Sequence, residues 1–451
     1  MSKIGPLDMR MKRFALLGAV VAISLSGSQL AHAEPNHSHG KHVNVNRMAD
    51  GKSIEGEYVV ALQDGASIDE VLGDLKIDKP IARYTHALNG FAAKLSSQQL
   101  LTLQSDDRVS LIDENGVGDT SSESECSLPL STTTCKGLTE AGRAFYQAHP
   151  EWFLDRISQQ QPLPTDPAAY VSSFNPASTG AGVNAYVLDN GIDLTHPEFG
   201  GRATNDHDVF PGGNGGLCPS SADSWDHGTE VAGMLGGSAT GIARQVKLHS
   251  VKISQCTTAT IVYSNMLLGV DWLLTGNNMQ KPAVVNISYE YPRIADLRST
   301  LTGAVDKLSA AGAFIATAAG NDANNPGTPW YACLSIPQNA KGGITVASST
   351  RLDTIAVDSN SGGCVGMYAP GLNVTTTAPN NTHMFVGGTS FAAPLVAGAA
   401  ALYKATYGDA PTATIQQWLI SHATSGAITD NPPPSSNFGT TPNLLLNISG
   451  L

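Results

Sequence analysis

The sequence predicts an α/β protein in which a parallel sheet carries helices on both faces, with a small α+β domain before it. Two observations support this fold class. Between residues 183 and 347, runs with the composition of buried strands alternate with segments of helical length, and parallel strands need such crossover connections. Between residues 56 and 115, strands and helices follow a different order. A chain of 451 residues is long enough for both domains.

Residues 56–115 form the small domain. Its predicted elements are strand 57–62, helix 67–75, strand 81–87, strand 91–95, helix 96–104 and strand 109–112. Asn89-Gly90 suits a tight turn between the second and third strands. The βαββαβ order predicts a ferredoxin-like plan.

Residues 151–451 form the large domain. Its predicted strands are 183–188, 246–253, 283–289, 313–318 and 344–347, and its predicted helices are 261–274, 297–311 and 392–401. Strands that alternate with helices are typical of a sheet covered on both faces. Sites in such sheets gather at the carboxyl ends of the strands. Asp189 and Asn321 both lie just after predicted strands.

Residues 388–394, with the sequence GTSFAAP, place one hydroxyl at the start of a helix. Residues 392–401 of that helix are almost all Ala, Gly, Val and Leu, so the helix must be buried. The unpaired N–H groups and the positive end of the helix dipole favour negative charge beside Ser390. This is a good position for a nucleophile, although a lone serine at a helix start is more commonly an N-cap.

Two further segments favour the nucleophile. Asp189 follows the strand 183–188, and His227 stands beside a glycine in the segment DHGTE. A serine hydroxyl is a weak nucleophile that needs a base to take its proton, and an aspartate can orient that base. The chain order Asp, His, Ser is one of the orders known for catalytic triads. The sequence therefore predicts a triad of Asp189, His227 and Ser390.

On these residues the chain resembles the subtilases, and within them the proteinase K group. The matching motifs are Asp189 in its Asp-x-Gly setting, His227-Gly228-Thr229, Ala318-Ala319-Gly320-Asn321 and the Gly-Thr-Ser-x-Ala-x-Pro signature around Ser390. The resemblance implies a subtilisin-like fold and a serine endopeptidase that works through an acyl-enzyme without a cofactor. It also implies that the Asn321 amide stabilises the oxyanion. From the residues alone, Asn321 is more typical of a turn.

The segment 87–95, ALNGFAAKL, resembles the inhibitory propeptide of the subtilases. This implies that residues 56–115 are an inhibitor and folding aid that the enzyme removes by self-processing. A polar linker, 34–55, precedes this domain, and a second linker, 116–150, contains the maturation site. A generic small α+β domain is the alternative.

The resemblance also places the pocket for the residue before the scissile bond. Its two walls are Ser288-Tyr289-Glu290 and Ala318-Ala319-Gly320. Subtilases have a glycine in place of Glu290, and glycine lets a peptide backbone approach closely. Glu290 and Asp322 suggest a preference for Lys or Arg, against the alternative that these carboxylates are only solvated.

Two other positions depart from the subtilase pattern. Asn190 replaces Thr or Ser, and Glu230 replaces the second His of His-Gly-Thr-His. These departures leave a second function open, a catalytically decayed subtilase that acts as a secreted binding scaffold. An esterase with the same triad is a third option, but an esterase would not need an inhibitory pro-segment. Because all four predicted catalytic residues are present, the sequence favours the protease.

The N-terminus has the pattern of a signal peptide, residues 1–33. Lys12 and Arg13 precede the apolar run 14–25, and Ala31-His32-Ala33 is a small-residue cleavage site. The run is too short for a permanent membrane anchor. We therefore expect a secreted, monomeric enzyme whose partners are protein or peptide substrates. The formal net charge of −12 argues against nucleic acid as a partner.

Six cysteines in an exported chain predict disulfides, although the sequence alone allows several pairings. The resemblance implies two pairs, Cys218 with Cys256 and Cys333 with Cys364. Cys126 and Cys135 would then close a short loop. Reduced, buried thiols are the alternative.

A structural calcium ion is a further expectation that the resemblance raises. The oxygen ligands on offer are Asp193, Glu198, Asp206 and Asp208. Solvated loop charges are the more common explanation of such residues. Gly366 stands where the proteinase K group has an aspartate ligand, which weakens the expectation.

Overall fold

The computed structural model describes residues 42–119, 126–127, 140–172, 174–210, 226–256, 260–292, 299–323, 331–435 and 437–451. The predicted signal peptide lies outside these ranges. Within them, no helix has the length and apolar character needed to cross a membrane.

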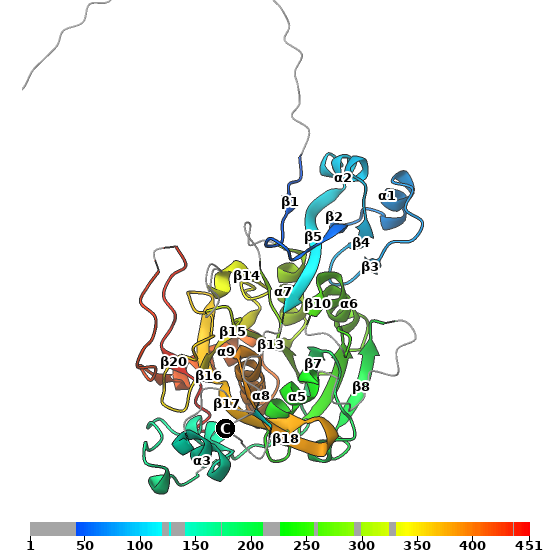
Figure 1. The fold of residues 1–451 in the computed structure, drawn as a ribbon. Coiled ribbons are helices and arrows are strands. Elements are labelled where there is room, and N and C mark those ends of the chain that lie inside the picture. The colour runs from blue at the N-terminus through cyan, green and yellow to red at the C-terminus, as the bar shows by residue number, and fades with distance from the viewer. Residues whose placement is uncertain are drawn as a thin grey trace, which may run out of the picture. The chain divides into compact units, whose positions relative to one another are not determined.

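The large sheet has nine strands in the order β19-β20-β16-β15-β13-β11-β7-β9-β8 (Figure 1). All neighbours from β20 to β8 are parallel, which confirms the predicted sheet. The strands are β7 (Asn184–Asp189), β8 (Ala203–Asp208), β9 (Lys247–Lys252), β11 (Ala283–Ile287), β13 (Ala313–Ala318), β15 (Gly343–Ser349), β16 (Val365–Pro370), β19 (Thr424–Ser425) and β20 (Leu444–Leu445).

Helices cover both faces of this sheet. In β7, Ala185 and Val187 join the core cluster that contains α5 (His227–Gly236) and α8 (Thr389–Tyr407). Tyr186 and Leu188 join the opposite cluster, which contains α6 (Tyr263–Leu274) and α7 (Thr300–Ala310). Because successive side chains of a strand point to opposite faces, the two clusters lie on the two sides of the sheet.

Helix α8 is buried from Thr389 to Lys404. Its small side chains let it pack closely against β11, β13 and β15. The helix starts three residues before the predicted 392–401 and places Ser390 in its first turn, as expected. A buried helix of this kind fixes its N-terminus against the sheet.

The small domain has the predicted βαββαβ order. Its sheet pairs the four main strands as β5-β2-β4-β3, the arrangement of a ferredoxin-like fold. Ser67 and Ser96 cap its two helices, as their positions before the helices suggest. The elements are β2 (Ser53–Leu62), α1 (Ile68–Asp74), β3 (Ala82–Tyr84), β4 (Gly90–Lys94), α2 (Ser97–Gln104) and β5 (Val109–Asp119).

Both predicted linkers contain regular structure. In 34–55, β1 (Val45–Asn46) pairs with β5, and β2 begins at Ser53. In 116–150, β5 continues to Asp119, and α3 (Glu140–Ala148) contributes Phe145 and Tyr146 to the core of the large domain. Residues from 140 onwards therefore pack as part of the large domain.

The remaining elements connect these units. Cys126–Ser127 (β6) pairs with β18, forming a three-stranded sheet β17-β18-β6.

Two helices start later than predicted, because Ile261 belongs to β10 and Ser299 caps α7. The other elements are α4 (Trp152–Arg156), β10 (Thr260–Val262), β12 (Tyr291–Pro292), β14 (Ser335–Ile336), β17 (Leu372–Ala378), β18 (Thr382–Gly387), α9 (Thr412–His422) and the 3-10 turns η1 (Pro167–Ala169), η2 (Pro197–Phe199), η3 (Ala332–Leu334) and η4 (Pro379–Asn381).

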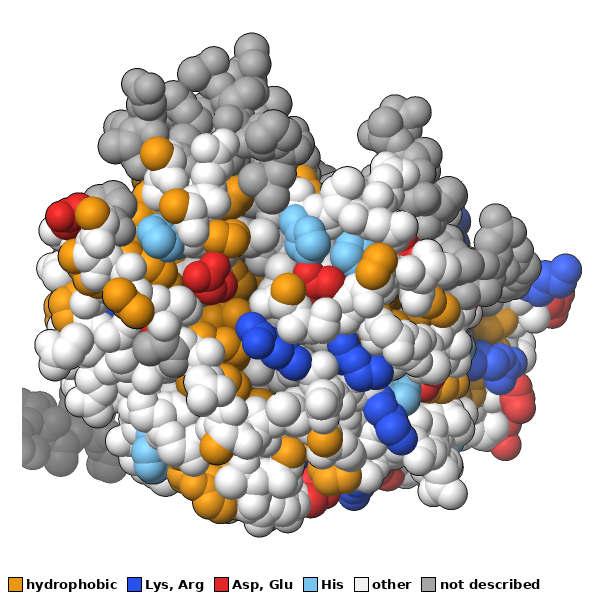
Figure 2. Space-filling view, turned by 90° about the horizontal axis from the view of Figure 1, so that it is seen from below, with side chains coloured by type: hydrophobic (Ala, Val, Ile, Leu, Met, Phe, Trp, Pro, Cys, Tyr) orange, Lys and Arg blue, Asp and Glu red, His pale blue; other side chains and the backbone are white. Residues whose placement is uncertain are grey.

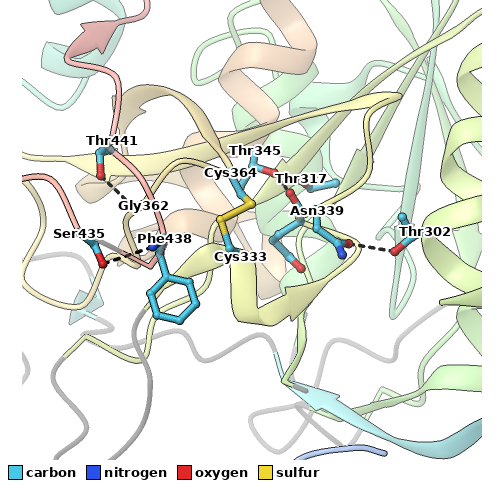
Figure 3. The surroundings of a disulfide bond; sticks show 11 residues. Thr302, Thr317, Cys333, Asn339, Thr345, Gly362, Cys364, Ser435, Phe438 and Thr441 are labelled. Carbon is cyan, nitrogen blue, oxygen red and sulfur yellow. Dashed lines mark hydrogen bonds between the residues drawn. A yellow bond between two sulfur atoms is a disulfide. The ribbon is translucent and has the colours of Figure 1, made fainter. Parts of the chain in front are cut away.

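A disulfide joins Cys333 and Cys364, the pair that the resemblance implied (Figure 3). It connects the turn η3 with the loop before β16. Cys256 is also disulfide-bonded. Its predicted partner, Cys218, lies outside the described residues, and so does Cys135.

Candidate active site

The predicted site residues meet where the strand order of the large sheet reverses. The strand β7 lies between β9, which follows it in the chain, and β11, which follows later on the other side. Asp189 ends β7, Ser288 follows β11, and Asn321 follows β13. Crevices at such a switch point, beyond the carboxyl ends of the strands, are the usual binding sites of open α/β sheets.

Asp189 and His227 form a buried pair. The Nδ1 atom of His227 lies 2.9 and 3.0 Å from the two carboxylate oxygens of Asp189. Oδ1 of Asp189 also accepts from the backbone N–H of Asn190 at 2.8 Å and from the hydroxyl of Tyr289 at 3.0 Å. Because a carboxylate only accepts, Nδ1 of His227 carries the proton, and Nε2 is the basic nitrogen.

Close approach of two loops brings this pair together. A Cβ on Gly228 would lie 2.1 Å from the carbonyl oxygen of Gly191, so only glycine fits beside His227. Asn190 accepts a hydrogen bond from the N–H of Gly228 through Oδ1, at 2.9 Å. The departure at residue 190 therefore supplies a contact that holds the two loops in register.

Ser390 is the second residue of α8, and Ser288 holds it in place. The Ser390 hydroxyl donates to the carbonyl of Ser288 at 3.1 Å, and the Ser288 hydroxyl donates to the carbonyl of Ser390 at 2.8 Å. Pro394 has no N–H to donate to that carbonyl, its partner four residues back, so the carbonyl can accept from Ser288 instead. The ring of His227 lies 5.6 Å, centroid to centroid, from that of Phe391.

Thr389 fixes the side chain of Asn321. Both the N–H and the hydroxyl of Thr389 donate to Oδ1 of Asn321, each at 2.8 Å. The amide nitrogen is thereby turned toward Gly388, where an added Cβ would lie 3.1 Å from it. Gly388 itself has a φ of 134°, which side-chain-bearing residues rarely adopt. Sequence reasoning did not identify Thr389, although it stands within the signature around Ser390.

The two predicted pocket walls lie side by side. Gln338 ties them together, because its Nε2 donates to the carbonyl of Tyr289 at 2.9 Å and to that of Ala318 at 2.8 Å. No local pattern marked Gln338 in the sequence. The wall residues Ser288, Tyr289, Glu290, Ala318, Ala319 and Gly320 are all buried.

Glu290 turns its carboxyl inward between these walls. It accepts from the N–H of Asn321 at 3.3 Å, the hydroxyl of Ser335 at 2.7 Å and Nδ2 of Asn360 at 3.4 Å. Burial, and then the charge of Asp322, raise the pKa of Glu290 well above its usual value. The carboxyl is therefore not simply solvated, which was the alternative.

Strand β5 of the small domain lies along the edge of this site. Residues 117–119 pair antiparallel with β10, and Asp119 exchanges N–H···O bonds of 3.1 and 3.3 Å with the backbone of Glu290 (Figure 1). A Cβ on Gly118 would lie 2.4 Å from the carbonyl oxygen of Glu290. Two backbones can approach this closely because β5 has a glycine, Gly118, at the contact. The side chain of Glu290 therefore does not prevent Asp119 from pairing with residue 290.

The carboxylates considered for calcium have protein donors. Glu198 accepts from the N–H groups of Ala239 and Thr240, and the other three also accept hydrogen bonds. Gly366, in β16, has no side-chain oxygen. Within the described ranges, no three His, Cys, Asp or Glu side chains are grouped to hold a metal ion. The carboxylates named as possible calcium ligands are therefore not gathered into one metal-binding group within the described residues.

Comparisons with known proteins agree with this geometry. The model of the Subtilase family matches residues 180–440. An extracellular serine proteinase of Thermus sp. (strain Rt41A) is 34% identical over 389 residues, covering 85% of this chain and 78% of that relative. Alkaline serine exoprotease A of Vibrio alginolyticus is 33% identical over 350 residues, covering 77% of this chain and 57% of that relative.

A solved structure described as a cold adapted subtilisin-like serine proteinase is also similar. It is 32% identical, has a TM-score of 0.54, and the match covers 66% of this chain and 98% of that one. The chain belongs to the subtilase family. It is a subtilisin-like serine endopeptidase.

Proposed function

We propose that the protein is a secreted endopeptidase that matures by self-processing and uses Asp189, His227 and Ser390 as its triad. The observation that carries this proposal is the buried Asp189–His227 pair at the sheet's switch point, beside the N-terminus of α8. In the first step, Nε2 of His227 takes the proton of the Ser390 hydroxyl while Oγ attacks the substrate carbonyl. Asp189 orients the imidazole and stabilises its charged form.

Collapse of the tetrahedral intermediate breaks the peptide bond. His227 returns the proton to the leaving amine, and an acyl-enzyme remains on Ser390. Water then attacks the ester, with His227 again as base, and releases the acid product. All proton transfers use the protein's own groups, so we propose that catalysis needs no cofactor.

Asn321 and the N–H of Ser390 are the proposed oxyanion donors. Thr389 supports this role because its two hydrogen bonds to Oδ1 of Asn321 fix the orientation of the side-chain amide. The N-terminus of α8 adds its positive dipole end. Removing one such amide costs about 3 kcal/mol of barrier, a figure measured in a subtilisin, which is a relative of this chain.

We infer that β5 occupies the groove in which substrates bind. An extended peptide that pairs with exposed backbone edges is a general mode of recognition, and β5 pairs with β10 and Glu290 in this way. The small domain would then inhibit the enzyme by filling this groove.

Several contacts hold the small domain against α6 and α7. A carboxylate oxygen of Asp113 accepts from the N–H of Thr300, at the start of α7, at 2.8 Å. Oδ1 of Asn115 accepts from the N–H of Ser264, in the first turn of α6, at 3.0 Å. Both acceptors satisfy N–H groups that a helix start leaves unpaired. These contacts support a role as folding aid, because they stabilise helix ends of the large domain.

The maturation cut is proposed to fall between Asp119 and Glu140, after the end of β5 and before the start of α3. Strand β5 ends at Asp119, which pairs with Glu290 in the predicted pocket wall. This interval of the sequence contains one basic residue, Lys136. A cut in this interval would leave α3 and its two core aromatics on the mature enzyme.

Export and monomeric action complete the proposal. The signal-peptide pattern of residues 1–33 supports secretion, and so does the similarity to the extracellular proteinase of Thermus sp.. Substrates are proposed to be proteins or peptides. On the face drawn in Figure 2, the described Lys and Arg side chains stand among acidic, apolar and uncharged ones and form no continuous basic band. The formal net charge of −12 supports the proposal that nucleic acid is not a partner.

The test is the Ser390→Ala variant expressed as the full chain. A fluorophosphonate should label the wild type but not the variant, and the variant should accumulate as unprocessed precursor. The exposed Ser421 on α9 gives a matched control, Ser421→Ala, which should be labelled and processed normally. A Ser390→Ala chain that still matures without added enzyme, or a wild type that neither labels nor digests casein, contradicts the proposal. The second result would favour the decayed binding scaffold.

A further inference from the structure

The carboxyl of Glu290 lies between the walls of the predicted substrate pocket, and Asp322 interacts with it. We propose that Glu290 and Asp322 make this pocket select Lys or Arg as the P1 residue, the one before the scissile bond. This inference rests on the peptidase function proposed above. It names the substrate class of the same site.

The position of Glu290 is the first step. Its backbone forms the outer edge on which Asp119 of β5 pairs, so residue 290 lines the groove of an extended peptide. Its side chain crosses to the opposite wall. There, Oε2 lies 2.2 Å from where a Cβ of Gly320 would stand, and Gly320 has a φ of 98°. The carboxyl therefore lies in the space between the two walls.

The second step concerns the hydrogen-bond partners of Glu290 and Asp322. Each of the donors to Glu290 is neutral: a backbone N–H, a serine hydroxyl and an asparagine amide. Asn360 also accepts from the N–H of Asp322 at 3.0 Å, so one residue holds both acids in place. Among the residues that the structure describes, no Lys or Arg forms an ion pair or hydrogen bond with either carboxyl.

The third step concerns the charge of the two carboxyls, Glu290 and Asp322. The buried carboxyl of Glu290 and the partly buried Asp322 beside it cannot both ionise cheaply, and the raised pKa of Glu290 reflects burial first and the charge of Asp322 second. A cation placed between the walls would remove this cost and make an ion pair with one or both acids. The ammonium of Lys and the guanidinium of Arg are the cations that a protein substrate supplies.

A purely structural role is the competing explanation. In that case the hydrogen bonds of Glu290 only stiffen the wall, and its side chain shortens the pocket. A shortened pocket would favour small P1 residues and would discriminate by size, whereas the carboxyl pair would discriminate by charge at equal size.

Peptide substrates that differ only at P1 separate these explanations. Norleucine has the chain of Lys without its ammonium, so the ratio of kcat/KM for Lys over norleucine reports charge at nearly constant size. With purified mature enzyme, we expect Lys and Arg to exceed norleucine by roughly tenfold or more, which corresponds to about 1.4 kcal/mol. A ratio near one, or a preference for small residues, overturns the inference.

Two variants test whether Glu290 and Asp322 cause the preference for Lys and Arg at P1. Glu290→Gln and Asp322→Asn should each lower the Lys-to-norleucine ratio toward one. Asp206→Asn is the control, because Asp206 lies on β8 and its carboxylate bonds His249 on β9. This variant should keep the wild-type ratio. If Glu290→Gln fails to mature, the wild-type ratio and Asp322→Asn decide the question. Efficient cleavage of apolar substrates without a charge preference overturns this inference alone, whereas no cleavage of any substrate contradicts the proposed function.

Discussion

At the scale of single residues, the surroundings of Asp189 explain how the imidazole is oriented. The carboxylate accepts from His227, from the N–H of Asn190 and from the hydroxyl of Tyr289. Burial, followed by the negative charge of Asp189, raises the pKa of Tyr289, so this hydroxyl keeps its proton. We therefore propose Tyr289 as a positioning residue, in addition to its predicted place in a pocket wall.

Replacing Tyr289 with Phe should lower kcat about tenfold with a smaller change in KM. A hydrogen bond to a charged group contributes about 1.5–3 kcal/mol, and part of that loss will be felt when His227 becomes charged. The loss should also shift the acidic limb of the pH profile of kcat/KM, which reports the base of the free enzyme. Steady-state kinetics across pH would check both.

Tyr186→Phe is the matched control for this experiment. The hydroxyl of Tyr186 bonds the backbone of Gln280 and Asn278, away from Asp189. It should leave the pH profile unchanged. An unaltered profile in Tyr289→Phe, with only KM affected, would limit Tyr289 to its role as a pocket wall.

Residue identities were more predictable than residue partners. Asp189, His227, Ser390 and Asn321 stand in local motifs with their own spacing, so the sequence could point to them. Thr389 and Gln338 act through contacts between segments far apart in the chain. Such contacts depend on how strands and loops pack, and no local pattern records them.

At the scale of elements, β18 is tied to the turn η2 by a charged pair. His383, in β18, bonds the carboxylate of Glu198, in η2. Burial would raise the pKa of Glu198, but hydrogen bonds from His383, Thr240 and Ala239 outweigh burial and lower the pKa to about 2. The bond to Glu198 raises the pKa of His383, against the effect of burial.

His383→Gln should therefore destabilise the protein most in mildly acidic solution. Glu198 contributes stability that is present above its unfolded pKa of about 4.5 and is lost as the pH falls toward 2. His383 contributes stability that is present below its unfolded pKa of about 6.5 and is lost as the pH rises through its raised folded value. Both contributions are full between about pH 4.5 and 6.5.

Thermal unfolding measured from pH 4.5 to 9 would check this window. The Ser390→Ala background prevents self-digestion during the scan. The difference in Tm between His383→Gln and its parent should be largest near pH 5.5 and should shrink in alkaline solution. His422→Gln, at an exposed histidine on α9, is the control. A difference that stays constant with pH would show that the charged pair contributes nothing.

The boundaries of helices and strands were predicted correctly where a local sequence signal marked them. The helices α1 and α2 begin after Ser67 and Ser96, because serine caps are local signals. The predicted strand 109–112 was too short, since β5 pairs with β2 as far as Gly116 and with β10 and Glu290 from Val117 to Asp119. The last three residues form their strand pairs with the large domain, so the small domain's own pattern gives no signal for them.

Helix α3 was missed for a related reason. Its Phe145 and Tyr146 are buried, and among their neighbours are Arg351 and Phe385 from distant parts of the chain. A short helix that follows a polar stretch reads as linker when those neighbours are unknown. The tertiary contact determines its role.

At the scale of the whole molecule, the small and large domains share a sheet edge, at which β5 pairs with β10. The carboxylate of Asp271, on α6, accepts from the consecutive N–H groups of Thr85, His86 and Ala87 in the small domain. Tyr84 donates to the carbonyl of Ser264 at 3.0 Å. The same interface ends with β5 against Glu290, so in our proposal docking of the small domain and filling of the groove occur together.

Gly118→Val should uncouple these two events. A valine Cβ would meet the carbonyl oxygen of Glu290 at 2.4 Å and the ring of Tyr291 at 2.7 Å, so β5 could not reach the groove without moving. We expect precursor to convert to mature enzyme at least several-fold more slowly, because the bond to be cut is presented through β5. Each mature molecule should keep full activity, since residue 118 is absent after the proposed cut.

A time course of precursor and mature bands, with active-site titration of the product, measures both quantities. Gly73→Ala provides the control, because Gly73 lies in α1 with open space around its Cα and no positive φ. Conversion of Gly118→Val at the wild-type rate would mean that β5 does not present the bond. Slow conversion with wild-type specific activity would instead tie maturation to the backbone contact at Glu290, the residue that also determines P1 selection in our proposal.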